Sequence, residues 1–209
     1  VHEAAAEFDR EHSVSRSSPM ALRLAEIGER VGQAASPPDY PYSFTLVNED
    51  VDNAFALPGG PVYFYQGLIN SLGDDEHQIA WVCAHEITHI RQQHAIRRIE
   101  RAIGASLLIE LALGEGTAAD VAGLVGSLSL QHYSRDHEHM ADQLGCRWAH
   151  QAGYDATAAI AVLQKFQEIQ GKEPNDFEIM FMSHPGNEDR VNVVKATLEQ
   201  YGISGAYHP

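Results

Sequence analysis

The sequence predicts an α+β protein that is mainly α-helical and forms one compact domain. Three short extended segments lie between residues 43 and 67, and a helical pattern of apolar residues runs from Gly67 almost to the end of the chain. With 209 residues, of which 44% are hydrophobic, the chain can bury one core, and no shift in composition divides it. We therefore expect a single domain over 1–209, with N-terminal helices in 1–36 and the core of the domain in 40–209.

The boundaries of the first elements can be assigned from local signals. Helices are expected over 2–11 and 18–35, and the second opens with a serine cap and with Pro19 in its first turn. The Pro-rich stretch "ASPPDYPYS" then breaks the chain before the extended segments "SFTLVN", "NAFALP" and "PVYFYQG". Pro58-Gly59-Gly60 is the expected turn between the last two, so a small sheet is implied.

The later helices are expected to break at Gly73, around 113–117, at "AGYD", around "GKEPND" and at "SHPGN". The longest apolar runs, "AIGASLLIELALG" and "VAGLVGSLSL", are shorter than the roughly 20 residues that a bilayer span needs. We interpret both runs as core helices and expect no transmembrane span.

Charge and cysteine content exclude several classes of protein. The net charge of −15, with only 14 basic residues, argues against binding to nucleic acid or to an anionic membrane surface. Two cysteines are too few for a disulfide framework, and Cys83 and Cys146 both sit in apolar helical surroundings. We expect both to be buried free thiols.

The segment "WVCAHEITHIRQQH", residues 81–94, carries two histidines four residues apart. On a helix such residues stack on one face, so His85 and His89 can converge on a single metal ion. Glu86 is angled beside that pair, where a carboxylate can reach a metal-bound water and act as a general base. The alternative is a chance match in a chain with 12 histidines, in which the two histidines lie on the surface or in the core and the glutamate is exposed.

The placement of this motif favours the metal interpretation. Residues 71–76 indicate a turn followed by an acidic first helical turn, which suits the positive end of a helix dipole. Apolar residues then recur at three- and four-residue steps, so the motif should lie inside a buried helix. This apolar stripe consists of Ile79, Val82, Cys83, Ile87 and Ile90.

A catalytic zinc ion usually has three protein ligands, so a third must come from another segment. In "YSRDHEHMADQLG", Glu138 and Asp142 share one face of a second helix. Glu138 could bind the metal, and Asp142 could accept a hydrogen bond from the far nitrogen of a ligand histidine. His137 and His139 are rival ligands by residue type but are rotated by about 100° from Glu138. Asp142 could also be only a solvated charge.

Together these segments resemble a known family. "CAHEITHI" followed by "EHMAD", with "NAFALPGG" upstream and "SHPGNEDR" downstream, is similar to the zinc metallopeptidases that include the Ste-type CAAX prenyl proteases, HtpX and the BepA-like proteases. The likeness covers about residues 40–200. It implies a compact gluzincin-like zincin domain, in which a small antiparallel or mixed sheet packs on the HExxH helix and the ExxxD helix. Because the apolar runs here are too short to span a bilayer, the likeness points to the soluble BepA-like branch.

The resemblance implies one Zn²⁺ per chain, bound by His85, His89 and Glu138, with Glu86 activating the water and Asp142 supporting the site. It also implies roles that spacing does not reveal. His184 and Arg190 match the family's His-Pro segment and would lie over the metal to help bind the substrate carbonyl or the tetrahedral intermediate. From the residues alone, His184 before Pro185 is only a loop histidine.

We therefore expect a metalloendopeptidase that hydrolyses unfolded or misassembled proteins. The substrate should bind in an extended conformation, because "NAFAL" is a short alternating strand whose free backbone groups can pair with a peptide. Its first four residues are the expected substrate-binding residues, although an ordinary sheet edge would have the same pattern. These residues are Asn53, Ala54, Phe55 and Ala56.

Two other functions remain open at this point. A latent zinc-binding chaperone or assembly factor would use the same groove, with His184 occupying the fourth metal position and closing the site. A hydrolase of non-peptide bonds is less well supported, because an edge strand suits a polypeptide.

From the resemblance we expect a periplasmic or other extracytoplasmic location, with a peripheral membrane or envelope-assembly partner; no leader is recognisable in this chain.

Overall fold

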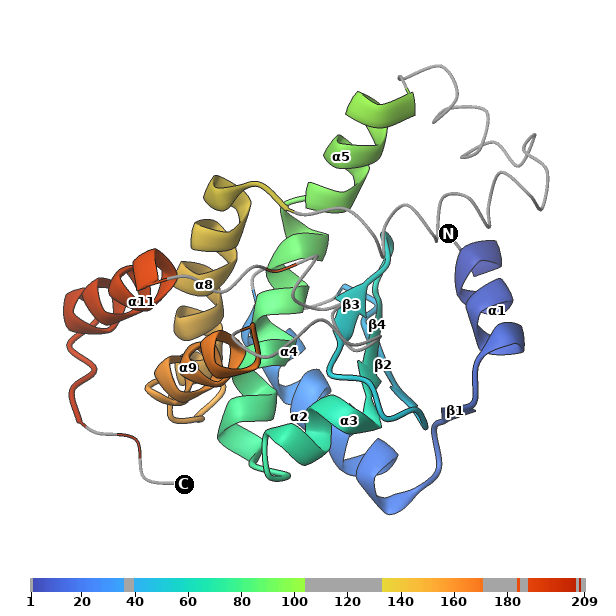
Figure 1. Ribbon diagram of the computed structural model, residues 1–209, viewed down its shortest axis with the longest axis horizontal. Helices are drawn as coiled ribbons and strands as arrows, with labels where there is room; N and C mark the ends of the chain where they lie inside the picture. Colours follow the sequence, from blue (N-terminus) through green and yellow to red (C-terminus); the bar gives the residue numbers. More distant parts are fainter. Residues whose placement is uncertain are drawn as a thin grey trace.

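Helices predominate in the computed structural model, which describes residues 2–35, 40–103, 133–170, 184, 188–205 and 207 (Figure 1). A small sheet accompanies them, so the predicted mainly α, α+β class is confirmed. In chain order the elements are α1 (His2–Glu11), β1 (Val14–Ser15), α2 (Pro19–Ala34), β2 (Ser43–Val47), β3 (Ala54–Ala56), β4 (Pro61–Tyr65), α3 (Gln66–Ser71), α4 (Glu76–Arg91), α5 (His94–Ile103), α8 (Arg135–Gln151), α9 (Ala158–Gln170) and α11 (Glu188–Gln200).

The sheet is mixed, with its strands in the order β1-β2-β4-β3. β2 and β4 are parallel, whereas β1 and β3 run antiparallel to their neighbours. All three predicted extended segments form strands, and the turn between β3 and β4 falls at the expected Pro58, Gly59 and Gly60, where both glycines have positive φ. β1 was not predicted, because two residues are too short to show an alternating pattern. Among the described strands, β3 pairs only with β4 and forms one edge of the sheet.

The two faces of the sheet are buried against different helices. Val62 and Phe64 of β4 belong to the main core with α2 and α4, and the alternate residues Tyr63 and Tyr65 point to a second cluster on the opposite face. Phe8 of α1 covers that second face, with its ring centroid 4.5 Å from that of Tyr63. The chain is thus layered, with α1, the sheet, α4 and then α8 in succession (Figure 1).

Helix α4 lies at the centre of the main core, and every residue from Gln78 to Ile90 is buried. Asp75 caps its N-terminus by accepting hydrogen bonds from the backbone N–H groups of His77 and Gln78. The predicted acidic start of this helix is therefore confirmed. A helix buried on all sides can carry polar side chains only where other groups contact them, which marks any buried polar residue of α4 as part of a network.

Helices α4 and α8 approach each other closely at Gly145. A Cβ atom on this residue would lie 3.3 Å from Trp81 Nε1 and 3.4 Å from the backbone N of His85. The absence of a side chain at Gly145 therefore lets the backbone of α8 approach the motif helix. Cys146, next to it, and Cys83 are both buried and unpaired, as expected.

The helix that carries the motif ends earlier than its sequence pattern indicates. Arg91 is the last residue of α4, Gln93 has a φ of 54°, and α5 begins at His94. We did not predict this break, because no glycine or proline marks it. The breaks expected around 113–117, at "GKEPND" and at "SHPGN" fall outside the described residues, apart from His184, as do nearly all residues of the two long apolar runs. The single-domain assignment stays a prediction.

None of the described helices combines the length and the hydropathy that crossing a bilayer requires.

Candidate metal centre

His85 and His89 converge as their four-residue spacing predicts. Their Nε2 atoms are 3.1 Å apart, and the exposed fractions of the two residues are 4% and 1%. Both side chains leave the same face of α4, one turn apart.

Helix α8 brings a carboxylate to this pair. Its N-terminus is capped by the hydroxyl of Ser134, which accepts from the backbone N–H of His137. Glu138, in the first turn, is buried with Oε2 3.5 Å from His85 Nε2 and Oε1 3.4 Å from His89 Nε2. The structure thus gathers three of the residues named from the sequence.

A third histidine joins the same group from a distant part of the chain. His184 is 1% exposed, and its Nδ1 lies 3.2 Å from His85 Nε2 and 3.0 Å from Glu138 Oε1. The four donor residues have ligand atoms that all lie within 4.8 Å of one another. His184 therefore lies among the donors and not only above them.

The separations of these donor atoms fit a small metal ion. Ligand atoms about 2.0 to 2.1 Å from a tetrahedral zinc ion must be roughly 3.3 Å from one another. The measured contacts, from 3.0 Å for His184–Glu138 to 3.5 Å for His85–Glu138, bracket that length. Two imidazoles and a carboxylate, with a third imidazole beside them, are also the donor types that zinc prefers. The residues present therefore fit a zinc ion.

The charges around the donors favour a cation. Burial raises the pKa of Glu138, but the positive charges of His184 and Arg190 outweigh it and hold that pKa well below its usual value. Burial likewise lowers the pKa of His85, but Asp142 and Glu138 outweigh it and raise the pKa to about 9. Carboxylates that stabilise a protonated imidazole so strongly would also stabilise a bound cation at the same place.

Glu86 is completely buried beside the donors. One oxygen, Oε1, lies 3.4 Å from His184 Nε2, and neither oxygen accepts a hydrogen bond from the described residues. Burial raises the pKa of Glu86, an effect that His184 and His85 partly offset. A buried carboxylate with free lone pairs and a raised pKa is suited to take up a proton.

Asp142 lies behind His85. Its Oδ1 is 3.1 Å from His85 Nδ1, the nitrogen that faces away from the donors, although the contact is too bent to count as an aligned hydrogen bond. Asp142 thus lies beside the ligand histidine to which the four-residue spacing from Glu138 assigned it, and the predicted hydrogen bond stays a prediction.

Arg190 connects three parts of the site and is itself 1% exposed. It donates to both oxygens of Asp142, its Nη1 lies 3.0 Å from Glu138 Oε2, and Nη1 also donates to the backbone oxygen of His184 at 3.3 Å. The guanidinium is thus enclosed by protein groups at the back of the donor cluster. The resemblance implied that Arg190 would help to bind the substrate, and that role stays a prediction.

The rival ligands lie outside the donor group. His137 stacks on the ring of His94, with centroids 4.0 Å apart, and His139 Nε2 contacts Asp189 at 3.2 Å.

Sequence reasoning missed His94 itself. Its Nδ1 lies 3.0 Å from Nδ1 of His89, and burial lowers its pKa to about 3. A histidine five residues after His89 gave no signal, because a continuous helix would place it on another face.

The residues expected to bind substrate lie on and beside β3. Ala54, Phe55 and Ala56 form the strand, and Asn53 precedes it, accepting a backbone hydrogen bond from Tyr65. β3 packs next to α4. A cavity of about 40 Å³ lies between the end of this strand and the donor cluster, with Ala56 and His89 both in its wall.

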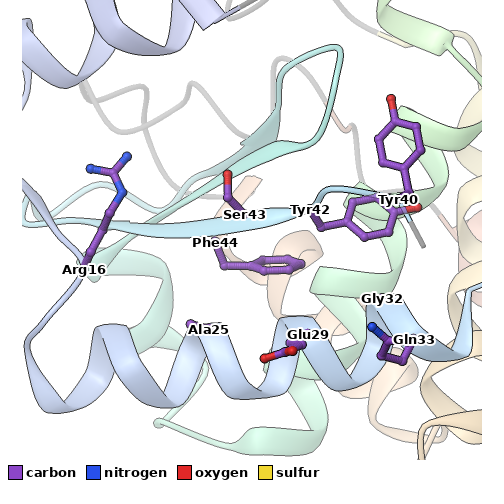
Figure 2. Close-up of a pocket in the computed structure, with 9 residues that line it drawn as sticks. All are labelled: Arg16, Ala25, Glu29, Gly32, Gln33, Tyr40, Tyr42, Ser43 and Phe44. Carbon is purple, nitrogen blue, oxygen red and sulfur yellow. The ribbon is translucent and has the colours of Figure 1, made fainter. Parts of the chain in front are cut away.

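A larger groove of about 520 Å³ lies elsewhere, between α2 and β2 (Figure 2). Glu29 and Gln33 of α2 and Phe44 of β2 line it, and no donor residue does. It is therefore separate from the candidate metal centre.

The helix that carries His85, Glu86 and His89, with its converging donors, is typical of metal-dependent peptidases, the class that the sequence motifs indicated. Residues 20–198 match the model of Peptidase family M48, and the chain belongs to that family. Membership implies a metal cofactor. The predicted resemblance and the predicted enzyme class are thereby confirmed.

Three relatives illustrate the similarity. The chain is 30% identical to the beta-barrel assembly-enhancing protease of Escherichia coli K12, over 80% of this chain and 37% of that protein. It is 30% identical to the mitochondrial metalloendopeptidase OMA1 of Arabidopsis thaliana, over 75% of this chain and 33% of that protein. It is 26% identical to metalloprotease YcaL of E. coli K12, over 93% of this chain and 77% of that protein. The chain thus spans less than two fifths of the assembly-enhancing protease.

Proposed function

We propose that this chain is a zinc-dependent endopeptidase whose metal ligands are His85, His89 and Glu138. The observation that carries the proposal is the convergence of their donor atoms, 3.1 to 3.5 Å apart, beside the buried carboxylate of Glu86. These separations support a tetrahedral ion, and the mixture of imidazole and carboxylate ligands supports zinc, at one ion per chain.

Glu86 is the general base in this proposal. A divalent ion bound at the donors would act as a Lewis acid that polarises the scissile carbonyl and lowers the pKa of water. Glu86 takes the proton of the attacking water and then delivers it to the leaving amine nitrogen. Its buried position and its raised pKa support this role, because the carboxylate must hold a proton between the two transfers.

His184 and Arg190 act at different distances from the reaction. The Nε2 atom of His184 is 3.4 Å from Oε1 of Glu86, so its N–H lies beside the proposed base. From there it can donate to the oxygen of the scissile carbonyl, on which negative charge develops. Arg190 instead positions Glu138, Asp142 and the backbone of His184, because its contacts are with these groups. Asp142 in turn fixes the ring of His85.

The substrate would bind as an extended strand beside β3. An edge strand offers an incoming peptide those backbone N–H and C=O groups that do not pair with the neighbouring strand. The proposed binding residues are Asn53, Ala54, Phe55 and Ala56, although the backbone oxygen of Asn53 already accepts from Tyr65. β3 packs against the helix that carries the motif, so a peptide paired with it would pass close to the donors. Recognition through the backbone suits substrates of varied sequence that are unfolded or misassembled.

The setting of the activity is proposed by analogy. Because the E. coli relative is named a beta-barrel assembly-enhancing protease, we propose a periplasmic or other extracytoplasmic location for this chain as well. An envelope-assembly partner or a peripheral membrane contact would bring substrates to it. The net charge of −15 argues against nucleic acid as a partner.

A latent zinc-binding chaperone is the alternative, and one observation speaks for it. His184 Nδ1 lies as close to Glu138 as a fourth ligand would, and a closed donor set is typical of structural zinc sites. Membership of a peptidase family favours the enzyme instead. In the enzyme, His184 would move away from the position of a fourth ligand when a substrate binds.

Cleavage of a denatured outer-membrane protein or of casein separates the two functions. We expect the wild-type chain to cleave it and Glu86→Gln to bind zinc without cleaving. Glu26→Gln, which changes an exposed glutamate of α2, is the matched control and should behave as the wild type does. Cleavage by Glu86→Gln at the wild-type rate would remove the proposed base, and zinc binding without any cleavage by the wild type would favour the chaperone.

A further inference from the structure

His89 is contacted on both of its ring nitrogens. Nε2 faces the donor cluster, where it lies 3.1 Å from His85 Nε2, and Nδ1 faces away, 3.0 Å from Nδ1 of His94. His94 is 0% exposed. A buried histidine therefore lies directly behind a proposed metal ligand.

The break between α4 and α5 creates this contact. In a continuous helix a residue five positions on is rotated by about 140°, so His94 would face away from His89. Gln93 instead adopts a φ of 54°, its backbone N–H donates to Ile90 O at 3.0 Å, and α5 starts at His94. A left-handed conformation is unfavourable for a residue other than glycine and persists only where the surrounding structure imposes it.

The direction of the hydrogen bond follows from metal binding. A neutral histidine that offers the lone pair of Nε2 to an ion carries its proton on Nδ1. That N–H of His89 can donate only to a lone pair, so Nδ1 of His94 must be the acceptor and the proton of His94 must be on Nε2.

We propose that His94 is a positioning residue that fixes the tautomer and the ring orientation of His89. The proposal rests on the proposed metal site. With His94 in this role, each ligand histidine of α4 has a partner at its Nδ1 atom, because Asp142 contacts Nδ1 of His85. The two supports differ in charge. His94 adds an acceptor without adding negative charge to a centre that already holds Glu86, Glu138 and Asp142.

Ring stacking holds this arrangement in place. The ring of His94 lies parallel to that of His137, with an interplanar angle of 9° and a centroid distance of 4.0 Å. The ring of His89 stacks on Tyr133 at 3.9 Å. Neither imidazole can rotate without disturbing its stacked neighbour. The stacking and the hydrogen bond together restrict the direction of the Nε2 lone pair of His89.

Three substitutions test the acceptor. His94→Leu removes it at similar size, His94→Asn keeps an oxygen close to the position of Nδ1, and His94→Gln moves the oxygen toward the position of Nε2. We expect zinc affinity, measured by competition with a chelator, to fall about 10- to 100-fold in the leucine variant, the range typical of losing such a partner. The asparagine variant should recover most of the affinity and the glutamine variant should not.

A second measurement detects the tautomer itself. Long-range ¹H–¹⁵N NMR of the zinc-loaded protein with labelled histidines should show the His89 proton on Nδ1 in the wild type and in the asparagine variant. In His94→Leu that proton should exchange rapidly with water and its signal should broaden. His150→Leu, which changes an exposed histidine of α8, is the control for losing an imidazole.

The outcomes separate this inference from the function on which it rests. If the wild type binds no zinc, the proposed metal site is wrong. If the wild type binds zinc and His94→Leu binds it equally well, only the role of His94 is overturned. Equal affinities in the asparagine and glutamine variants would overturn it too, even if the leucine variant does not fold.

Discussion

Arg190 holds Asp142 through two parallel hydrogen bonds, from Nε at 2.8 Å and from Nη2 at 2.7 Å, and both side chains are almost completely buried. Bidentate pairing of this kind fixes both partners in one plane. Since Asp142 also contacts His85 and Arg190 also contacts Glu138, the pair joins two proposed ligands from behind.

Arg190→Leu should lower the free energy of unfolding by about 3–5 kcal/mol, because it leaves two buried carboxylates without their counter-charge. Urea unfolding in the presence of a chelator measures this without a contribution from metal. Arg23→Leu is the control, since Arg23 pairs with Glu76 at 3.6 Å on the surface and should contribute less than about 1 kcal/mol. Equal losses in the two variants would contradict the structural role given to Arg190.

Glu138→Ala should weaken zinc binding as severely as His85→Ala does, because each removes one of three proposed ligands. The purified wild-type chain should hold about one zinc ion, which elemental analysis can count. Glu168→Ala removes an exposed glutamate from α9 and should leave the zinc content unchanged. Full zinc retention in Glu138→Ala would mean that the third ligand lies elsewhere.

His184→Ala distinguishes two roles of the same imidazole. Loss of an oxyanion donor should reduce turnover of a quenched peptide by about 10²- to 10³-fold, whereas loss of a blocking ligand should raise it. We expect the reduction in turnover to dominate for small peptides. The hydrogen bond from His184 is needed in every turnover, whereas a blocking His184 has only to move aside. Unchanged turnover would exclude both roles.

Gly145→Val should separate α8 from α4 where the two helices are closest. An added Cβ already lies 3.3 Å from Trp81 Nε1, so a branched side chain overpacks the contact at a cost of about 1–3 kcal/mol. Zinc affinity should fall as well, because the displacement moves Glu138 relative to His85. Gln143→Val places the same side chain on an exposed position of α8 and should change neither quantity. Wild-type affinity in Gly145→Val would show that the contact does not set the ligand geometry.

Signals confined to one short segment predicted much of the fold. The serine cap and Pro19 at the start of α2, the acidic start of α4, and the glycines of the β3–β4 turn all act within a few residues. Helical spacing also brings His85 and His89 together, because positions four apart share a face whatever the rest of the chain does.

Other features depend on groups that are far apart in the sequence or on unmarked turns. The partners of Arg190 could not be found from spacing, since Asp142 is 48 residues away. His94 was missed because Gln93 takes a left-handed conformation that its residue type does not signal. The resemblance named His184 and Arg190, but only the structure shows that His184 lies among the donors and that Arg190 contacts both a donor and Asp142 behind it.

The donor group joins segments that are up to 99 residues apart, from α4 through α8 to His184. An unfolded chain cannot present such a set, so any ion that binds it stabilises the folded state alone. At a free concentration about 1,000 times the dissociation constant, that linkage amounts to about 4 kcal/mol, a large share of the usual stability of a domain. A chain that has not obtained its ion would unfold more often and be degraded sooner, so the supply of metal would regulate how much of this peptidase persists as well as how much of it is active.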